Sequence, residues 1–178
     1  MSCPINKLYN DFENLKNYLL ENKELDYLNT VEKQFTKNLI ISSASFLESY
    51  MQDILTNFVE STSNHQLITS FFKNKAISRQ YHTYFDWNSK NANNFLGLFG
   101  IDFRDTTKAK IKEENTDKHI KDFLELGKIR NELVHQNFTL YTTDKTTKEI
   151  IELFDSAYKF LDFFKQELEL SLKDNKTE

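Results

Sequence analysis

The stretch LIISSASFLESYMQDILTNF, residues 39–58, lies within the segment that decides the fold. From Phe35 to Phe58 apolar residues recur at steps of three and four, and neither glycine nor proline interrupts residues 30–60. This spacing is that of an α-helix that buries one stripe of its surface. Around Ser42, Ser43 and Ala44 the segment is weakly polar on nearly every side, which suits a helix enclosed by others. We therefore predict one long central helix over residues 30–60.

The same period appears on both sides of this segment. Pro4 suits the first turn of a helix that continues to about residue 22. An apolar stripe also predicts a helix over residues 116–138. Thr146 and Glu149 have the spacing of a capping box, and a last long apolar stripe follows them. Shorter helices are predicted at residues 67–75 and 93–100, the latter ending at Gly100, and the charged segment 108–117 is predicted to be exposed.

Together these segments predict an all-α fold, an antiparallel helical bundle with two long core helices and additional shorter helices. A chain of 178 residues with 39% hydrophobic content is long enough for one domain with a core. Three glycines and one proline are too few for an all-β fold of this size. We predict a single domain over residues 1–173, followed by a disordered tail at residues 174–178.

Composition also limits the classes of function. The single cysteine, Cys3, cannot form an internal disulfide, and no run of about 18 apolar residues is present. These features predict a cytoplasmic protein with no membrane association. A formal net charge of −4 argues against a protein that coats nucleic acid through bulk electrostatics.

A local basic and aromatic segment, residues 69–94, stands out against this acidic background. Its basic residues are Lys73, Lys75, Arg79 and Lys90, and its rings include Tyr81, His82, Tyr84, Phe85 and Trp87. Cations bind phosphates and aromatic planes stack on bases, so this segment is a candidate RNA-binding face. Its candidate contacts are Lys73, Lys75, Arg79 and Tyr81. The same pattern also fits a solvated connector whose aromatic residues cap the core.

The stretch that points to chemistry is RNELVHQN, residues 130–137. On a helix Asn131 and His135 are neighbours on one face, and the long side chain of Arg130 can reach toward them. Metal-free cleavage of an RNA phosphodiester needs a base, an acid and positive charge on the phosphate oxygens. Histidine transfers protons near neutral pH and arginine binds phosphate oxygens. Arg130, Asn131 and His135 are therefore the candidate catalytic residues, although the spacing alone is weak evidence.

The order of motifs along the chain strengthens this interpretation. Arg130-Asn131-Glu132-Leu133-Val134-His135 resembles the Arg-Asn-x-x-x-His signature of the HEPN superfamily of helical ribonuclease and defence domains. Upstream of that signature lie SASFLESY at residues 43–50, Trp87, and FLGLFGIDF at residues 95–103. At its end, HQNF at residues 135–138 extends it. This order resembles that of the RiboL-PSP-type HEPN domains and covers about residues 30–170.

The resemblance implies a metal-independent endoribonuclease that leaves a 2′,3′-cyclic phosphate and a 5′-hydroxyl. It also implies a homodimer in which Arg130 and His135 of both subunits line one cleft. Such domains act in phage defence, toxin–antitoxin systems and stress responses, on RNA such as tRNA or mRNA. An antitoxin or a neighbouring effector protein is thus a possible partner. HEPN toxins regulated by nucleotidylation carry tyrosine two residues after the histidine, and Asn137 stands there instead.

Three further residues are secondary candidates. Glu48, among small and apolar residues of the central helix, is predicted to hold Arg130 or Asn131 in place, or else to be a partly exposed helix glutamate. His119, eleven residues before Arg130, returns to nearly the same helical face and either borders the cleft or lies on the surface. Lys128 is a further candidate RNA contact. We predict no metal site and no cofactor, since neither metal-ligand spacing nor a glycine-rich phosphate loop is present.

Two other functions stay open at this level. A HEPN bundle can keep its fold and serve as an RNA-binding subunit or as a docking subunit for a regulatory partner. A purely structural helical protein would leave the intact Arg-Asn-x-x-x-His motif to chance.

Overall fold

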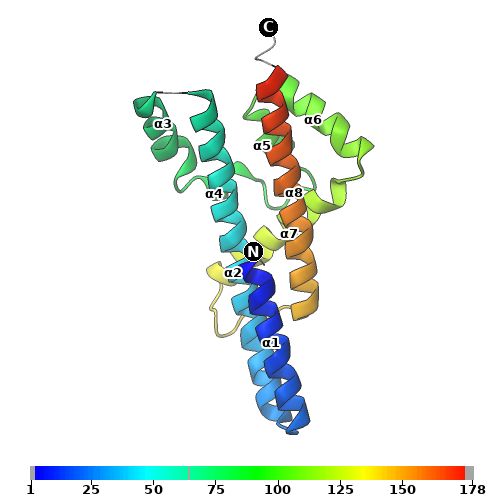
Figure 1. Cartoon of the computed structure of the whole chain (residues 1–178). Coiled ribbons are helices and arrows are strands. Elements are labelled where there is room, and N and C mark those ends of the chain that lie inside the picture. The colour runs from blue at the N-terminus through cyan, green and yellow to red at the C-terminus, as the bar shows by residue number, and fades with distance from the viewer. Residues whose placement is uncertain (1–2, 64, 175–178) are drawn as a thin grey trace.

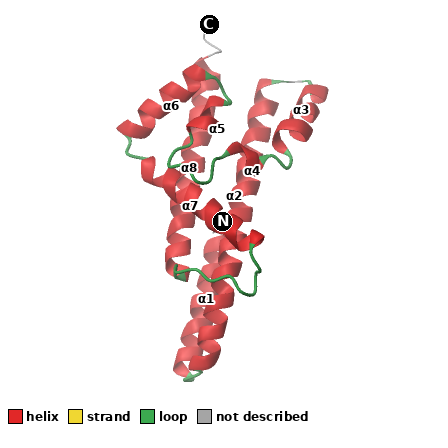
Figure 2. Cartoon of the chain, turned by 180° about the vertical axis from the view of Figure 1, so that it is seen from behind, coloured by secondary structure: helices red, strands yellow, loops and turns green. Residues whose placement is uncertain are grey.

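A computed structural model describes residues 3–63 and 65–174, and all the regular structure in these two ranges is helical (Figure 2). The predicted tail lies almost wholly outside the described residues. The helices are α1 (Pro4–Glu21), α2 (Leu25–Thr62), α3 (Gln66–Phe72), the π-helix η1 (Lys73–Ile77), α4 (Tyr81–Tyr84), α5 (Asn93–Gly97), α6 (Ile101–Glu113), α7 (Asp117–His135) and α8 (Thr147–Asp174). The all-α prediction is confirmed.

The long helix α2 organises the molecule. Its first half packs against α1, which runs antiparallel to it, and its middle packs against α7 and α8 (Figure 1). Beyond this middle, α3 lies on the α2 side and α5 and α6 lie on the α8 side. The centre, where α2, α7 and α8 meet, is therefore the part of the molecule covered by the most helices.

The core forms where the apolar stripes of these three helices face one another. Leu39 and Ile40 of α2, Leu133 of α7 and Phe164 of α8 are fully buried. The predicted enclosed segment of α2 is confirmed, because Ser43 and Ala44 are buried with their apolar neighbours. Burying these stripes supplies the main driving force for packing the helices.

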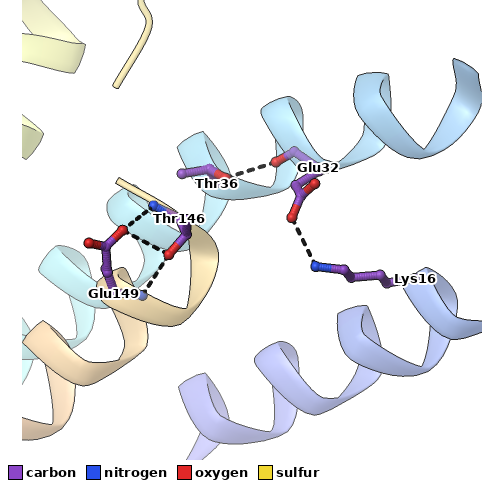
Figure 3. A network of polar contacts seen from close by, with 5 residues as sticks. All are labelled: Lys16, Glu32, Thr36, Thr146 and Glu149. Atoms are coloured by element: carbon purple, nitrogen blue, oxygen red, sulfur yellow. Dashed lines mark hydrogen bonds and ion pairs between the residues drawn. The ribbon is translucent and has the colours of Figure 1, made fainter. Parts of the chain in front are cut away.

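The capping box before α8 is confirmed. The Thr146 amide donates to Glu149 Oε2 at 2.7 Å, and the Glu149 amide donates to Thr146 Oγ1 at 3.2 Å (Figure 3). Both amides lie in the first turn of the helix, where no intrahelical acceptor exists. In the same region, Lys16 of α1 pairs with Glu32 of α2, with Lys16 Nζ 3.0 Å from Glu32 Oε1.

Several predicted boundaries are wrong. Helix α2 begins at Leu25, five residues before the predicted start. Gly100 does not end a helix: it adopts φ +106°, a conformation favourable to glycine, and precedes α6, which begins at Ile101. Helix α7 ends at His135, where Gln136 turns to extended backbone, so only the first six residues of the 130–137 motif are helical.

Candidate functional site

The end of α7 presents the three candidate catalytic residues at different depths. Arg130 and Asn131 are half-buried, and Arg130 Nη1 donates a hydrogen bond to Asn131 Oδ1 at 3.1 Å. His135, the last residue of the helix, is exposed. Leu133, on the opposite side of the helix, is fully buried and anchors this turn in the core. The motif thus combines a buried anchor with a polar face that a substrate can reach.

Two further side chains come to this face from other helices. Glu48 lies in the middle of α2, and its Oε2 is 3.7 Å from Nε2 of His82 in α4. Glu48 Oε1 also accepts a hydrogen bond from Gln52 Nε2 at 3.4 Å. Glu48 and His82 are 34 positions apart in the sequence and only tertiary packing brings them together.

Electrostatic interactions connect Glu48 and His82 with the Arg130 motif of α7. Burial lowers the pKa of His82 below its usual value, and the positive charges of Arg130 and His135 lower that pKa further, while Glu48 opposes them. Burial and the charge of Glu48 also raise the pKa of Tyr81, against the influence of Arg130. These interactions and two contacts, Glu48 with His82 and Arg130 with Asn131, relate five side chains of α2, α4 and α7, which we call the Arg–His cluster: Glu48, His82, Arg130, Asn131 and His135.

A tight aromatic contact fixes α4 against α7. A Cβ placed on Gly127 would lie 2.0 Å from Cζ3 of Trp87, so the indole occupies the space that any larger side chain would need. Trp87 Nε1 in turn donates a hydrogen bond to the backbone carbonyl of His82 at 3.2 Å. Gly127 lies one turn before Arg130 on the same helix. The absence of a side chain at Gly127 therefore helps to position His82 beside the motif.

The segment after α7 is tied to α2. The ammonium of Lys37, a residue that is only 6% exposed, donates to the carbonyls of Phe138 at 2.7 Å and Thr139 at 3.2 Å. These bonds satisfy a cation that would be costly to bury alone. The side chains of Val134, at the end of α7, and of Phe138 and Leu140, in the segment that follows, are exposed. Exposed apolar side chains therefore stand before and after His135 in the sequence.

The prediction that Tyr81 stacks on RNA is wrong. Its side chain is buried and packs against Phe85, Trp87 and Phe123 with ring centroids 6.1, 5.6 and 6.4 Å away. The alternative role, capping the core, is the correct one for this ring. Lys73, Lys75 and Arg79 are exposed in η1 and in the turn before α4, and their contact with RNA remains a prediction.

His119 does not border the cluster. Its Nδ1 lies 2.7 Å from Ser156 Oγ, between α7 and α8. Burial and the charge of Lys159 lower the pKa of His119, and Asp122 opposes them. Because eleven residues of helix extend over about 16 Å, its alignment with Arg130 along the helix does not bring the two side chains together.

The predicted role of Glu48 needs a correction. In the described part of the chain Glu48 Oε2 lies 3.7 Å from His82 Nε2, a pair that is ionic only when His82 is protonated, and the hydrogen bond of Arg130 is with Asn131. Glu48 therefore does not hold Arg130 or Asn131 directly. Lys128 is exposed and lies 4.0 Å from Glu132 on the same helix, and its contact with RNA also remains a prediction.

A cavity of about 970 Å³ opens on another part of the molecule. Its lining includes Phe58 of α2, Thr83 of α4, Phe99 and Leu168, and neither Arg130 nor His135 is part of it. The cavity is separate from the Arg–His cluster and mostly apolar. We do not assign the cluster's chemistry to it.

Comparison with known families identifies the family of this chain. The family model described as RiboL-PSP-HEPN matches residues 5–170. The chain therefore belongs to the RiboL-PSP-HEPN family. No curated protein and no solved structure gave a match.

The described residues contain neither a metal-binding cluster of side chains nor a membrane-spanning helix. Within residues 3–63 and 65–174, no three His, Cys, Asp or Glu side chains gather closely enough to hold a metal ion. None of the helices described is both long and apolar enough to span a membrane.

Proposed function

We propose that this protein is a metal-independent endoribonuclease of the HEPN type. The observation that carries the proposal is the placement of Arg130, Asn131 and His135 on the last two turns of α7, in a chain that matches the RiboL-PSP-HEPN family over residues 5–170. Membership of the family supports an RNA-related function. The half-buried guanidinium beside an exposed imidazole supports cleavage rather than binding alone.

Each side chain has a defined task in this proposal. Arg130 binds the phosphate oxygens and stabilises the negative charge that builds on them in the transition state. Asn131, which accepts a hydrogen bond from Arg130, keeps the guanidinium directed toward the phosphate. His135 transfers a proton to or from the reacting oxygens. The 2′-oxygen attacks phosphorus and the 5′-oxygen leaves, which gives a 2′,3′-cyclic phosphate and a 5′-hydroxyl.

We further propose that two chains associate through the end of α7. The exposed side chains of Val134, Phe138 and Leu140 support this, because apolar surface beside an active site is a frequent feature of subunit interfaces. A two-fold axis there would bring two copies of Arg130 and two copies of His135 into one cleft. The substrate class that we propose is tRNA or mRNA, in a defence, toxin–antitoxin or stress setting.

The test is RNA cleavage in EDTA by the purified protein and by two variants. We expect His135→Ala to lose cleavage of tRNA and mRNA by a factor of about 100 or more. His65→Ala, which changes an exposed histidine of the distant α3 end, is the matched control and should cleave like the unaltered protein. Equal activity of the unaltered and His135→Ala proteins would refute the proposal. RNA binding that survives both Arg130→Ala and His135→Ala would then favour a non-catalytic RNA-binding module.

A further inference from the structure

His82 is the one member of the Arg–His cluster that contributes an ionisable imidazole and has no task in the proposed reaction. It lies on α4, a helix of four residues that the sequence pattern does not predict. Its Nε2 is 3.7 Å from Glu48 Oε2, and its ring lies 6.4 Å from the Trp87 ring. The His82 side chain is 39% exposed, so solvent can reach it, and Trp87 links its backbone to Gly127, one turn before Arg130.

We propose that His82 is a second catalytic residue, which accepts the proton of the 2′-hydroxyl within the same protomer whose Arg130 binds the phosphate. This inference rests on the proposed ribonuclease function. It adds a proton acceptor that comes from outside the 130–135 motif.

The surroundings of His82 fix the position of its ring. Glu48 Oε2 lies 3.7 Å from Nε2 on the α2 side, and Trp87 Nε1 donates a hydrogen bond to the His82 backbone carbonyl at 3.2 Å. The turn that leads into α4 is also constrained, since Arg79 adopts φ +63°, a conformation uncommon for residues other than glycine. These contacts fix the backbone of His82 and place a carboxylate beside its ring, which limits the positions that the imidazole can take.

The charges that face His82 suit the role of a base. From α2 comes the carboxylate of Glu48, from α7 come Arg130 and His135, and from α4 itself comes the phenol of Tyr81. Burial and the interactions with Arg130 and His135 lower the pKa of His82, which favours the neutral imidazole that can accept a proton.

The reaction then balances with two histidines. Neutral His82 takes the proton from the 2′-hydroxyl as the bond between the 2′-oxygen and phosphorus forms. The bond between phosphorus and the 5′-oxygen breaks, and protonated His135 gives its proton to that leaving oxygen. Arg130 remains charged and hydrogen-bonded to phosphate oxygens throughout. The products are the cyclic phosphate, the 5′-hydroxyl, His82 protonated and His135 neutral, and exchange with water restores both imidazoles.

A simple structural role for His82, as the partner of Glu48, predicts different behaviour. In that case His82→Gln, which retains a polar group of similar reach, would alter stability more than catalysis. The pH dependence of the reaction separates the two roles, because only a catalytic base sets the acidic limb of the rate profile.

The experiment measures kcat and KM for RNA cleavage from pH 5 to pH 8 in EDTA. The proteins are the unaltered chain, His82→Gln and the control His65→Gln. We expect His82→Gln to lower kcat about 100-fold or more with little change in KM, and to remove the acidic limb of kcat/KM, while the control stays within about two-fold. Circular dichroism and thermal melting establish that each variant is folded.

Glu48→Gln is the second variant, in case His82→Gln does not fold. Because the negative charge of Glu48 raises the pKa of His82, its removal should move the acidic limb to lower pH. An unmoved limb in Glu48→Gln, or a fully active His82→Gln protein, would overturn the assignment of His82 alone. If the unaltered protein cleaves no better than His135→Ala, the ribonuclease function fails and the role of His82 falls with it.

Discussion

Replacing Gly127 by alanine perturbs the contact that joins α4 to α7. The new Cβ would lie 2.0, 2.2 and 2.9 Å from Cζ3, Cε3 and Cη2 of Trp87, distances that are too short for non-bonded carbon atoms. The indole cannot move freely, because Tyr81, Phe85 and Phe123 surround it with ring centroids 5.6, 5.3 and 5.8 Å away. Either the tryptophan or helix α7 must therefore shift.

Two opposing effects set the size of the change. Alanine is favoured over glycine within a helix by about 1 kcal/mol. Overpacking in a well-packed region typically costs about 1–3 kcal/mol, and the deep overlap with Trp87 places Gly127→Ala in the upper part of that range, at about 2–3 kcal/mol. We expect a net loss of about 1–2 kcal/mol in the free energy of unfolding. For a chain of this length, that loss corresponds to a fall in Tm of roughly 2–8 °C.

Thermal and urea unfolding measure this loss, and Gly97→Ala provides the matched control. A Cβ on Gly97 would meet only Arg104 Cδ at 3.9 Å, an ordinary contact, so this variant should stay within about 0.5 kcal/mol of the unaltered protein. The reasoning would be refuted if Gly127→Ala were as stable as the unaltered protein. It would also be refuted if Gly97→Ala lost just as much stability.

Three other predictions follow from contacts near the motif. Lys37→Ala removes the donor to the Phe138 carbonyl and should lower the free energy of unfolding by about 1–3 kcal/mol. Backbone hydrogen exchange in the segment after α7 should become faster, and unchanged exchange would contradict the account. Burial lowers the pKa of His119, so near and below pH 6.5 the folded protein binds fewer protons than the unfolded chain. The free energy of unfolding should therefore fall as the pH drops below about 6.5. Urea unfolding at pH 7.5 and 5.5 measures this fall, which should be smaller in His119→Gln. Light scattering should give twice the chain mass of 21.2 kDa, and Val134→Glu with Leu140→Glu should give a single chain mass; a monomeric unaltered protein would refute the dimer.

The sequence predicts the long helices well, because each has a continuous apolar stripe that its neighbours bury. Phe35 to Phe58 predicts most of α2, and Thr146 with Glu149 predicts the start of α8 within one residue. These signals are local: they need only the helical period and the unsatisfied amides of a first turn. The end of α7 was harder to predict, since neither glycine nor proline stands near Gln136 to signal it.

The candidate site was predicted in part. The Arg130 motif lies on the last two turns of one helix, so its spacing predicts that Arg130, Asn131 and His135 share one region, and the contact between Arg130 and Asn131 is present. The pairing of Glu48 with His82 depends on how a four-residue helix packs against α2, and no periodicity exists over four residues. The burial of Tyr81 has the same origin. The one available signal was the unusual density of aromatic residues around Trp87, which marks a packed cluster as readily as a binding face.

The central claim is that this cluster cleaves RNA by attack of the 2′-oxygen without a metal ion. Its most direct test is a pair of otherwise identical short RNAs, incubated with the protein in EDTA, one of which lacks the 2′-hydroxyl at the nucleotide before the cut. We predict that the all-RNA strand is cut to a 2′,3′-cyclic phosphate and a 5′-hydroxyl, and that the 2′-deoxy strand is not cut at that position. Cutting of both strands at the same position, or of neither, would contradict the claim.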